Sequence, residues 1–119
     1  MTFFKAKLFS KVDTAEKRRS RRISYRCPVD FAVGHEKFER FSRTLSSGGL
    51  YIATPYDLPP ETIIHMRIGV GNNGKSIPAQ GTVIYNISGH GMGVKFLKIR
   101  PEDQRKIEVI LEKSWWQEV

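Results

Sequence analysis

The chain has 119 residues, of which 39% are hydrophobic, and it carries a net charge of +8 at pH 7. This length and composition suit one small domain with a single hydrophobic core. No run of about 18 apolar residues is present, which excludes a membrane-spanning helix, and the first residues lack the apolar stretch of a signal peptide. Cys27 is the only cysteine, so no internal disulfide is expected. These features predict a cytoplasmic protein.

The positive charge is concentrated toward the start of the chain. Residues 1–26 carry nine Lys or Arg and two acidic residues, whereas the rest of the chain carries eleven basic and ten acidic ones. A basic segment on a nearly neutral body is typical of a site for an anion such as a nucleotide, a nucleic acid or an acidic membrane. A solvated basic tail would have the same composition. We expect residues 1–22 to form a flexible basic arm and residues 23–119 to form the folded domain.

Six segments are predicted to be strands, because apolar and polar residues alternate along them with a period of two. They span residues 23–31, 38–45, 50–53, 63–70, 77–87 and 92–97. In the second of these strands we expect Phe38, Phe41 and Leu45 to face inward. Glycine-containing segments at 71–74 and 88–91 predict hairpin turns.

The spacing of the strands predicts the fold class. Six short strands with turns about every ten residues are typical of a mainly β protein, here a six-stranded antiparallel β-barrel. The last segment changes to a period of three to four residues, and Pro101, Glu102 and Asp103 have the character of a helix start. We expect one amphipathic helix over about 101–116 that packs on the barrel.

A cluster of six basic residues lies between residues 17 and 26. Their mutual repulsion is relieved by solvent or by an anion. The planar fork of an arginine matches a phosphate, or the O6 and N7 edge of guanine, with paired hydrogen bonds. Arginine also stacks on aromatic rings. A ligand that combines phosphates with guanines would use all of these properties.

A second polar cluster spans residues 44–49, Thr-Leu-Ser-Ser-Gly-Gly. Thr44 and Ser46 lie two residues apart, so their hydroxyl groups share one face of an extended chain. The two glycines permit a close approach of the backbone to a ligand. The segment therefore suits a ring edge or a phosphate, although an ordinary Ser/Gly turn would have the same sequence.

The order and spacing of these motifs resemble the PilZ domain family, whose members are receptors for the bacterial second messenger cyclic di-GMP. Arg18 and Arg22 form an Arg-x-x-x-Arg pair, and a strand opening Ile-x-Tyr and a proline follow it. Residues 44–49 then read polar-x-Ser-x-x-Gly, and residues 91–96 read Gly-Met-Gly-Val-Lys-Phe. The resemblance covers roughly residues 16–100, and the C-terminal helix also fits it.

The resemblance implies a PilZ-type barrel in which the arginine pair binds cyclic di-GMP from a flexible arm and the second motif binds it from the barrel surface. The arm would fold over the ligand and change the surface that a partner protein recognises, as in the control of motility or biofilm formation. The ligand-binding residues implied by this resemblance are Lys17, Arg18, Arg19, Arg22, Thr44, Ser46 and Gly49.

One position departs from the family pattern. The second motif usually begins with Asp or Asn, and here that residue is Thr44. A carboxylate accepts two hydrogen bonds from the N1 and N2 donors of guanine, whereas a threonine hydroxyl accepts one without charge assistance. The loss of a charge-assisted bond costs about 1.5–3 kcal/mol, roughly a ten- to hundredfold loss of affinity.

Other classes of function were weighed against this one. No acid, base and nucleophile set stands out, so we expect no enzyme, no cofactor and no catalytic residue. His35, His65 and His90 are too scattered for a metal site. A nucleotide-free protein–protein interaction module, favoured by Thr44, stays open, as does general nucleic-acid binding, although we expect no DNA partner. Residues 1–12 could also contact a membrane surface as a short amphipathic helix.

Overall fold

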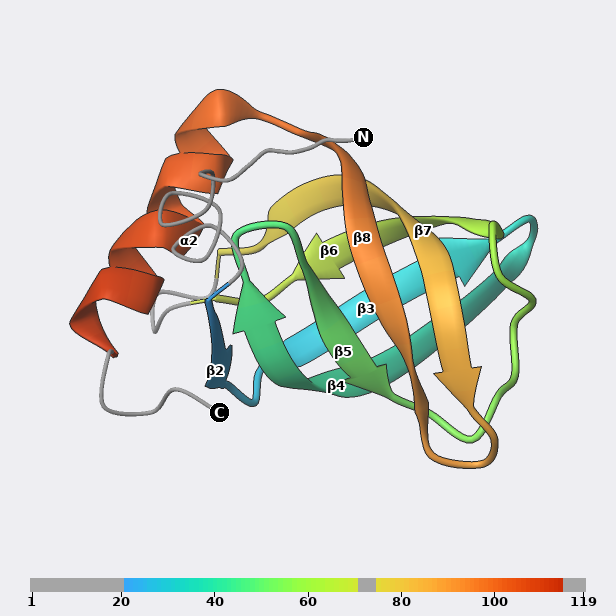
Figure 1. Ribbon diagram of the computed structural model, residues 1–119. Helices are drawn as coiled ribbons and strands as arrows, with labels where there is room; N and C mark the ends of the chain where they lie inside the picture. The colour runs from blue at the N-terminus through green and yellow to red at the C-terminus, as the bar shows by residue number, and fades with distance from the viewer. Residues whose placement is uncertain (1–20, 71–74, 115–119) are drawn as a thin grey trace, which may run out of the picture.

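The computed structural model describes residues 21–70 and 75–114, which form seven strands and one helix (Figure 1). The elements are β2 (Arg22–Ser24), β3 (Pro28–Val33), β4 (Glu36–Ser46), β5 (Gly49–Ala53), β6 (Ile63–Ile68), β7 (Ile77–Ile87), β8 (Gly91–Ile99) and α2 (Pro101–Lys113). Within the described residues, no helix is long and apolar enough to cross a membrane.

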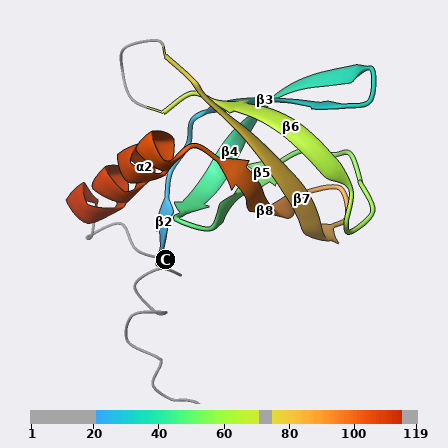
Figure 2. The same ribbon diagram turned by 90° about the horizontal axis from the view of Figure 1, so that it is seen from above.

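The strands form one antiparallel sheet that closes on itself. Its order is β2-β4-β3-β6-β7-β8-β5, and the pairing of β5 with β4 closes six of the strands into a barrel. The short strand β2 is added beside the C-terminal half of β4, and α2 lies against one end of the barrel (Figures 1 and 2). The predicted six-stranded barrel with a C-terminal helix is therefore confirmed.

The first predicted strand, residues 23–31, is interrupted and forms two elements. Both β2 and β3 pair with β4, but the register moves by one residue between Ser24, opposite Thr44, and Pro28, opposite Phe41. Pro28 has no N–H to continue the ladder. At the break the hydroxyl of Ser42 accepts a hydrogen bond of 3.0 Å from the Cys27 amide, so a side chain replaces part of the regular pairing.

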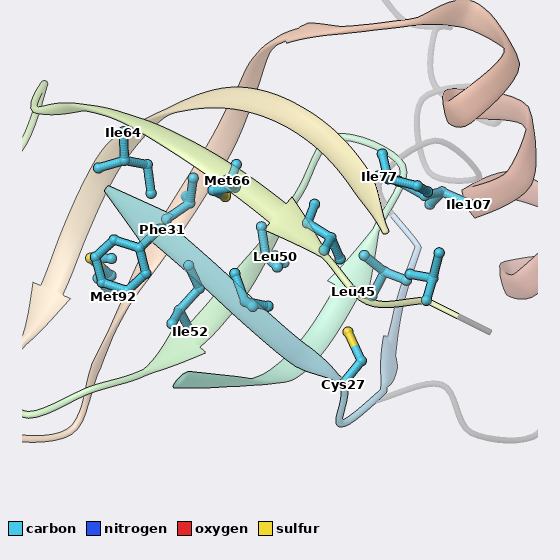
Figure 3. Packing of buried hydrophobic residues seen from close by; sticks show 14 of the residues in the cluster. Cys27, Phe31, Leu45, Leu50, Ile52, Ile64, Met66, Ile77, Met92 and Ile107 are labelled. Atoms are coloured by element: carbon cyan, nitrogen blue, oxygen red, sulfur yellow. The ribbon is translucent and has the colours of Figure 1, made fainter. Parts of the chain in front are cut away.

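The core fills the inside of the barrel (Figure 3). The alternation predicted for the fourth strand is confirmed, because Ile64, Met66 and Ile68 are buried while His65 and Arg67 between them are exposed. At about 25 cal/mol for each Å² of buried apolar surface, side chains of this kind supply most of the driving force for folding.

Phe41 does not belong to this core, which corrects the inward position expected for it. Phe38 and Leu45 are buried as predicted, but Phe41 is 41% exposed. Phe41 lies three residues after Phe38, so the period of two places it on the opposite face, and a bulge in the pairing of β4 with β5, between Ser42 and Thr44, brings Leu45 back to the inner face. The ring of Phe41 lies on the outer surface beneath the guanidinium of Arg26, 3.8 Å from its centroid.

The C-terminal helix closes one end of the core. Ile107 and Leu111 are buried and one turn apart, so they form the inner face of α2. Pro101 occupies the first turn, as predicted. The helix ends at Lys113, and the predicted continuation through residues 115–116 lies outside the described residues, as does the hairpin expected at 71–74.

Candidate functional site

The second polar motif forms the tight turn between β4 and β5. Ser46 ends β4 and Gly49 begins β5, and the two residues are paired in the sheet. The Ser46 hydroxyl donates a hydrogen bond of 3.2 Å to the Gly49 carbonyl. The Phe96 amide donates one of 2.8 Å to the Gly48 carbonyl, which ties the turn to β8. The motif is therefore a fixed part of the barrel surface.

The last arginine of the basic cluster meets this motif directly. Arg22 in β2 is the cross-strand partner of Ser46, and Ser24 is the partner of Thr44. Because Ile23 is paired with Leu45 and both side chains lie in the core, the side chains on either side of them point to the outer face, where Arg22 and Ser24 are exposed and Ser46 is largely covered. The other predicted ligands in the basic arm, Lys17, Arg18 and Arg19, lie outside the described residues.

Arg22 and Ser46 border a surface depression of about 210 Å³, which we call the cradle. No aspartate or glutamate lines it, and a second cation does, Lys95 of β8. Lys95 is exposed and is the cross-strand partner of Gly49. The residues that line the cradle are Arg22, Ser46, Gly48, Gly49, Leu50, Tyr51, Ile84, Tyr85, Gly93, Val94 and Lys95. Two cations without a carboxylate favour an anionic ligand.

Two tyrosine rings form one side of the cradle. Tyr51 of β5 and Tyr85 of β7 are both cross-strand partners of Gly93 in β8, and their ring centroids are 6.3 Å apart. A Cβ atom on residue 93 would collide with the Tyr85 ring. The glycine thus allows an aromatic ring to lie over the sheet at this position, where it adds a flat apolar surface beside the cations.

Gly49 is required by the packing of the strands. A Cβ atom at this position would collide with the carbonyl oxygen of Val94 on β8, whereas one on Gly48 would meet nothing within 4 Å. Since β5 and β8 approach closely here, Gly49 has a role in closing the barrel whether or not a ligand is bound.

Thr44 has a hydrogen-bonding group without a partner. Its Oγ1 atom is buried, and it forms no hydrogen bond within the described part of the chain. A buried hydroxyl in this state costs about 1–3 kcal/mol of desolvation. The first residue of the second motif therefore carries a locally unfavourable group in the protein alone.

Cys27 and the histidines show no sign of reactive chemistry. Burial raises the pKa of the Cys27 thiol, against the weaker opposite effect of its hydrogen bond with Ser42, so the thiolate form is disfavoured. Within residues 21–70 and 75–114, no three His, Cys, Asp or Glu side chains are grouped as metal ligands would be.

The sequence reasoning missed Lys95, Tyr51 and Tyr85. Lys95 lies in the Gly-Met-Gly-Val-Lys-Phe segment, and the residue before it, Val94, is buried. The period of two predicts that Lys95 faces outward. Its place opposite Gly49 depends on the register of β5 against β8, which no local pattern reveals.

A comparison of the chain with models of known protein families finds one match. The model of the PilZ domain family matches residues 16–113 of the chain. No curated protein sequence matches the chain significantly.

Solved structures show the same fold at low sequence identity. The inhibitor of motility MotI/DgrA of Bacillus subtilis aligns with a TM-score of 0.74 and 15% identity over 83% of this chain and 51% of MotI, so the chain spans about half the length of that protein. The PilZ domain of CeSA from a cellulose-synthesising bacterium aligns with a TM-score of 0.58 and 22% identity over 82% of this chain and 99% of the domain. The PilZ domain of YcgR from Escherichia coli, solved with c-di-GMP, aligns with a TM-score of 0.63 and 18% identity over 82% of this chain and 90% of that one.

Proposed function

The chain belongs to the PilZ domain family, a family of cyclic di-GMP receptors, and on that basis we propose that it binds cyclic di-GMP in the cradle and passes the signal to a partner protein. The family membership gives the class of ligand. The chemistry of the cradle supports the same ligand independently.

One observation carries the proposal: Arg22 lies directly opposite Ser46 in the pairing of β2 with β4. The Arg-x-x-x-Arg motif and the polar-x-Ser-x-x-Gly motif are separated by more than 20 residues in the sequence, yet their ends are neighbours on one face. The Arg22 guanidinium supplies paired donors suited to a phosphate or to the O6 and N7 edge of a guanine, and the Ser46 hydroxyl, whose proton is donated to the Gly49 carbonyl, offers its oxygen as an acceptor.

The remaining cradle residues suit the other parts of the ligand. Lys95 supplies a second positive charge for a second phosphate. Tyr51 and Tyr85 supply flat aromatic surface on which a base can stack, a contact worth about 1–3 kcal/mol per base in single-stranded nucleic-acid complexes. A dinucleotide with two phosphates and two guanines uses each of these groups.

In this proposal the basic arm completes the site. Lys17, Arg18 and Arg19 lie just before Arg22 in the sequence, so a ligand held at Arg22 is within their reach. Binding neutralises the mutual repulsion of the arm and holds it against the cradle. The ligand binds more tightly when the arm lies over the cradle than when it does not, and this difference in affinity drives the change. The partner protein then recognises the altered surface.

Isothermal titration calorimetry of the full chain with cyclic di-GMP tests the proposal, with GTP and cyclic GMP as controls for selectivity. We expect saturable binding of cyclic di-GMP alone, weakened about tenfold or more in Arg18→Ala and in Lys95→Ala. Arg67→Ala, an exposed arginine of β6 outside the cradle, is the matched control and should bind as the wild type does. Absence of heat up to high micromolar ligand would refute the proposal.

A second candidate, a PilZ scaffold that binds a protein but no nucleotide, is favoured by Thr44. The neutral hydroxyl at this position lacks the charge that an aspartate would bring, and its Oγ1 atom is buried. Thr44→Asp separates the two candidates. If the protein is a receptor weakened at this position, the variant binds cyclic di-GMP about ten- to hundredfold more tightly. If the cradle does not bind the ligand at all, the variant gives no heat of binding in the same titration.

A further inference from the structure

A second depression, of about 600 Å³, lies beside the cradle on the surface of β2, β4 and β5; we call it the outer depression. Ser24 and Thr44, which are paired across β2 and β4, both line it. Thr44 is in turn the cross-strand partner of Tyr51, which lines the cradle. The two depressions are therefore neighbours in the register of the sheet.

The register places the side chains that join the two depressions on one face of the sheet. Tyr51 lies between Leu50 and Ile52, which are both buried, so Tyr51 points outward. One row of the register runs through both depressions, and its members are Ser24, Thr44, Tyr51, Gly93 and Tyr85. Four spacings of about 4.8 Å between strands make this row roughly 19 Å long. The joined surface therefore suits an extended ligand.

Flat groups are exposed toward both ends of this surface. Phe41 faces outward, because its cross-strand partner Ala53 follows the buried Ile52. The exposed guanidinium of Arg26 lies 3.8 Å from the centroid of the Phe41 ring, which holds it in place. At the other end Tyr85 is 40% exposed. Unpaired bases stack on guanidinium planes as they do on aromatic rings, so each end offers a surface for a base.

The same surface is basic and nearly free of acids. Arg22 and Lys95 line the cradle, and Arg26 and Arg43 line the outer depression. Neither Arg26 nor Arg43 forms an ion pair with another residue that the structure describes. Glu39 is the one acid among the described lining residues; β2, β5, β7, β8 and the part of β4 that follows Glu39 contain none. Such a row of cations is complementary to a chain of phosphates.

We propose that the cradle and the outer depression together bind single-stranded nucleic acid. One base stacks on the Arg26 guanidinium and another on the Tyr85 ring. The phosphates between them contact Arg22, Arg43 and Lys95. Single strands fit and duplexes do not, because only unpaired bases present their flat faces to such groups. The inference goes beyond the proposed function, since an oligonucleotide also occupies the outer depression and needs no cyclic di-GMP.

The test is a fluorescence anisotropy titration of a labelled uridine decamer with the full chain, without cyclic di-GMP and at several salt concentrations. Arg26→Lys keeps the charge but removes the plane, so we expect affinity to fall roughly two- to thirtyfold with an unchanged salt dependence. Arg43→Ala removes one phosphate contact, so the slope of log affinity against log salt should become shallower by about 0.7. Arg67→Ala, on the outer face of β6 and outside both depressions, is the matched control and should change neither quantity.

Two outcomes would overturn the proposal. One is the absence of decamer binding at low salt. The other is binding that Arg26→Lys and Arg43→Ala leave unchanged, because the basic arm alone would then attract the decamer. Both positions lie outside the cradle, so both variants should bind cyclic di-GMP as the wild type does. A thymidine deoxydecamer titrated in parallel identifies the strand: tighter binding of the uridine decamer assigns the site to RNA, and equal binding assigns it to single strands of either kind. Circular dichroism verifies that each variant is folded.

Discussion

The side-chain amide of Gln104 in α2 donates a hydrogen bond of 2.7 Å to the backbone carbonyl of Ser47, in the turn that joins β4 to β5. The contact is partly buried and joins residues 57 positions apart. Ser47 stands between Ser46 and Gly48 of the cradle. The C-terminal helix is therefore attached to the backbone segment at which the second motif would contact a ligand.

Replacing Gln104 by alanine tests whether this attachment positions the turn. A neutral hydrogen bond contributes about 0.5–1.5 kcal/mol, so we expect Gln104→Ala to weaken cyclic di-GMP binding by roughly two- to tenfold and to speed amide exchange in the turn. Hydrogen exchange and calorimetry measure the two effects. Glu108→Ala, on the exposed face of the same helix, is the control. Unchanged affinity in Gln104→Ala would show that the helix and the cradle are uncoupled.

Thr44→Val removes the buried hydroxyl that has no partner in the described chain. Because a group of similar shape replaces it, we expect the free energy of unfolding to stay equal or to rise by up to about 1 kcal/mol. Urea unfolding measures this, with Thr62→Val for comparison. The Thr62 hydroxyl donates a hydrogen bond of 2.7 Å to the Pro59 carbonyl, so its loss should destabilise by about 0.5–1.5 kcal/mol. A clear loss of stability in Thr44→Val would mean that its hydroxyl is satisfied in solution.

The glycines of the second motif differ in what an added methyl group would meet. Gly49→Ala places a Cβ against the Val94 carbonyl, whereas Gly48→Ala meets nothing within 4 Å. We expect Gly49→Ala to cost at least about 1–3 kcal/mol of stability by forcing β5 from β8, and Gly48→Ala to be nearly neutral. Thermal unfolding of the pair checks this. Similar melting temperatures for the two variants would contradict the closeness of β5 to β8.

The buried carboxylate of Asp103, in the first turn of α2, makes the stability of the protein depend on pH. Burial alone would raise the pKa of Asp103, but a hydrogen bond from Arg100 and the ion pair with Lys106 hold it below its ordinary value. A carboxyl whose pKa is lowered by folding stabilises the native state above its unfolded-state pKa of about 3.9. This contribution is lost as the pH falls through the folded-state value.

Asp103→Asn should therefore be less stable than the wild type at pH 7, and the difference should shrink as the pH falls below about 4. Urea unfolding at a series of pH values measures it. Glu102→Gln, the exposed acidic neighbour in the same turn, is the control and should show a smaller change. A difference that is independent of pH would mean that the Asp103 charge does not stabilise the helix start.

The strands of the barrel could be predicted from the sequence because the pattern that indicates a strand is local. Ile64, Met66 and Ile68 alternate with exposed residues, and this pattern identifies a strand and its inner face without knowledge of its neighbours. The inward position expected for Phe41 was wrong because Phe41 lies three residues after Phe38 and so faces the other side of the sheet. Phe38 and Leu45 share the inner face only because of the bulge between Ser42 and Thr44.

The candidate site depends instead on register, which is a long-range property. The family resemblance pointed to Arg22 and Ser46 separately, but their direct pairing follows from the alignment of β2 with β4. Lys95 enters the cradle only because β8 pairs with β5 at Gly49. Such relations depend on the closure of the whole barrel, and one-residue shifts like that between Ser24 and Pro28 alter them.

The central claim is that Arg22 and Ser46 act together on one ligand, and a double-mutant cycle measures this directly. Calorimetry gives the affinity for cyclic di-GMP of the wild type, Arg22→Ala, Ser46→Ala and the double variant. We expect each single variant to bind more weakly, and the two effects to be non-additive by about 0.5–3 kcal/mol, as for residues that share a partner. Wild-type affinity in both single variants, or effects that simply add, would contradict a shared site at this pair.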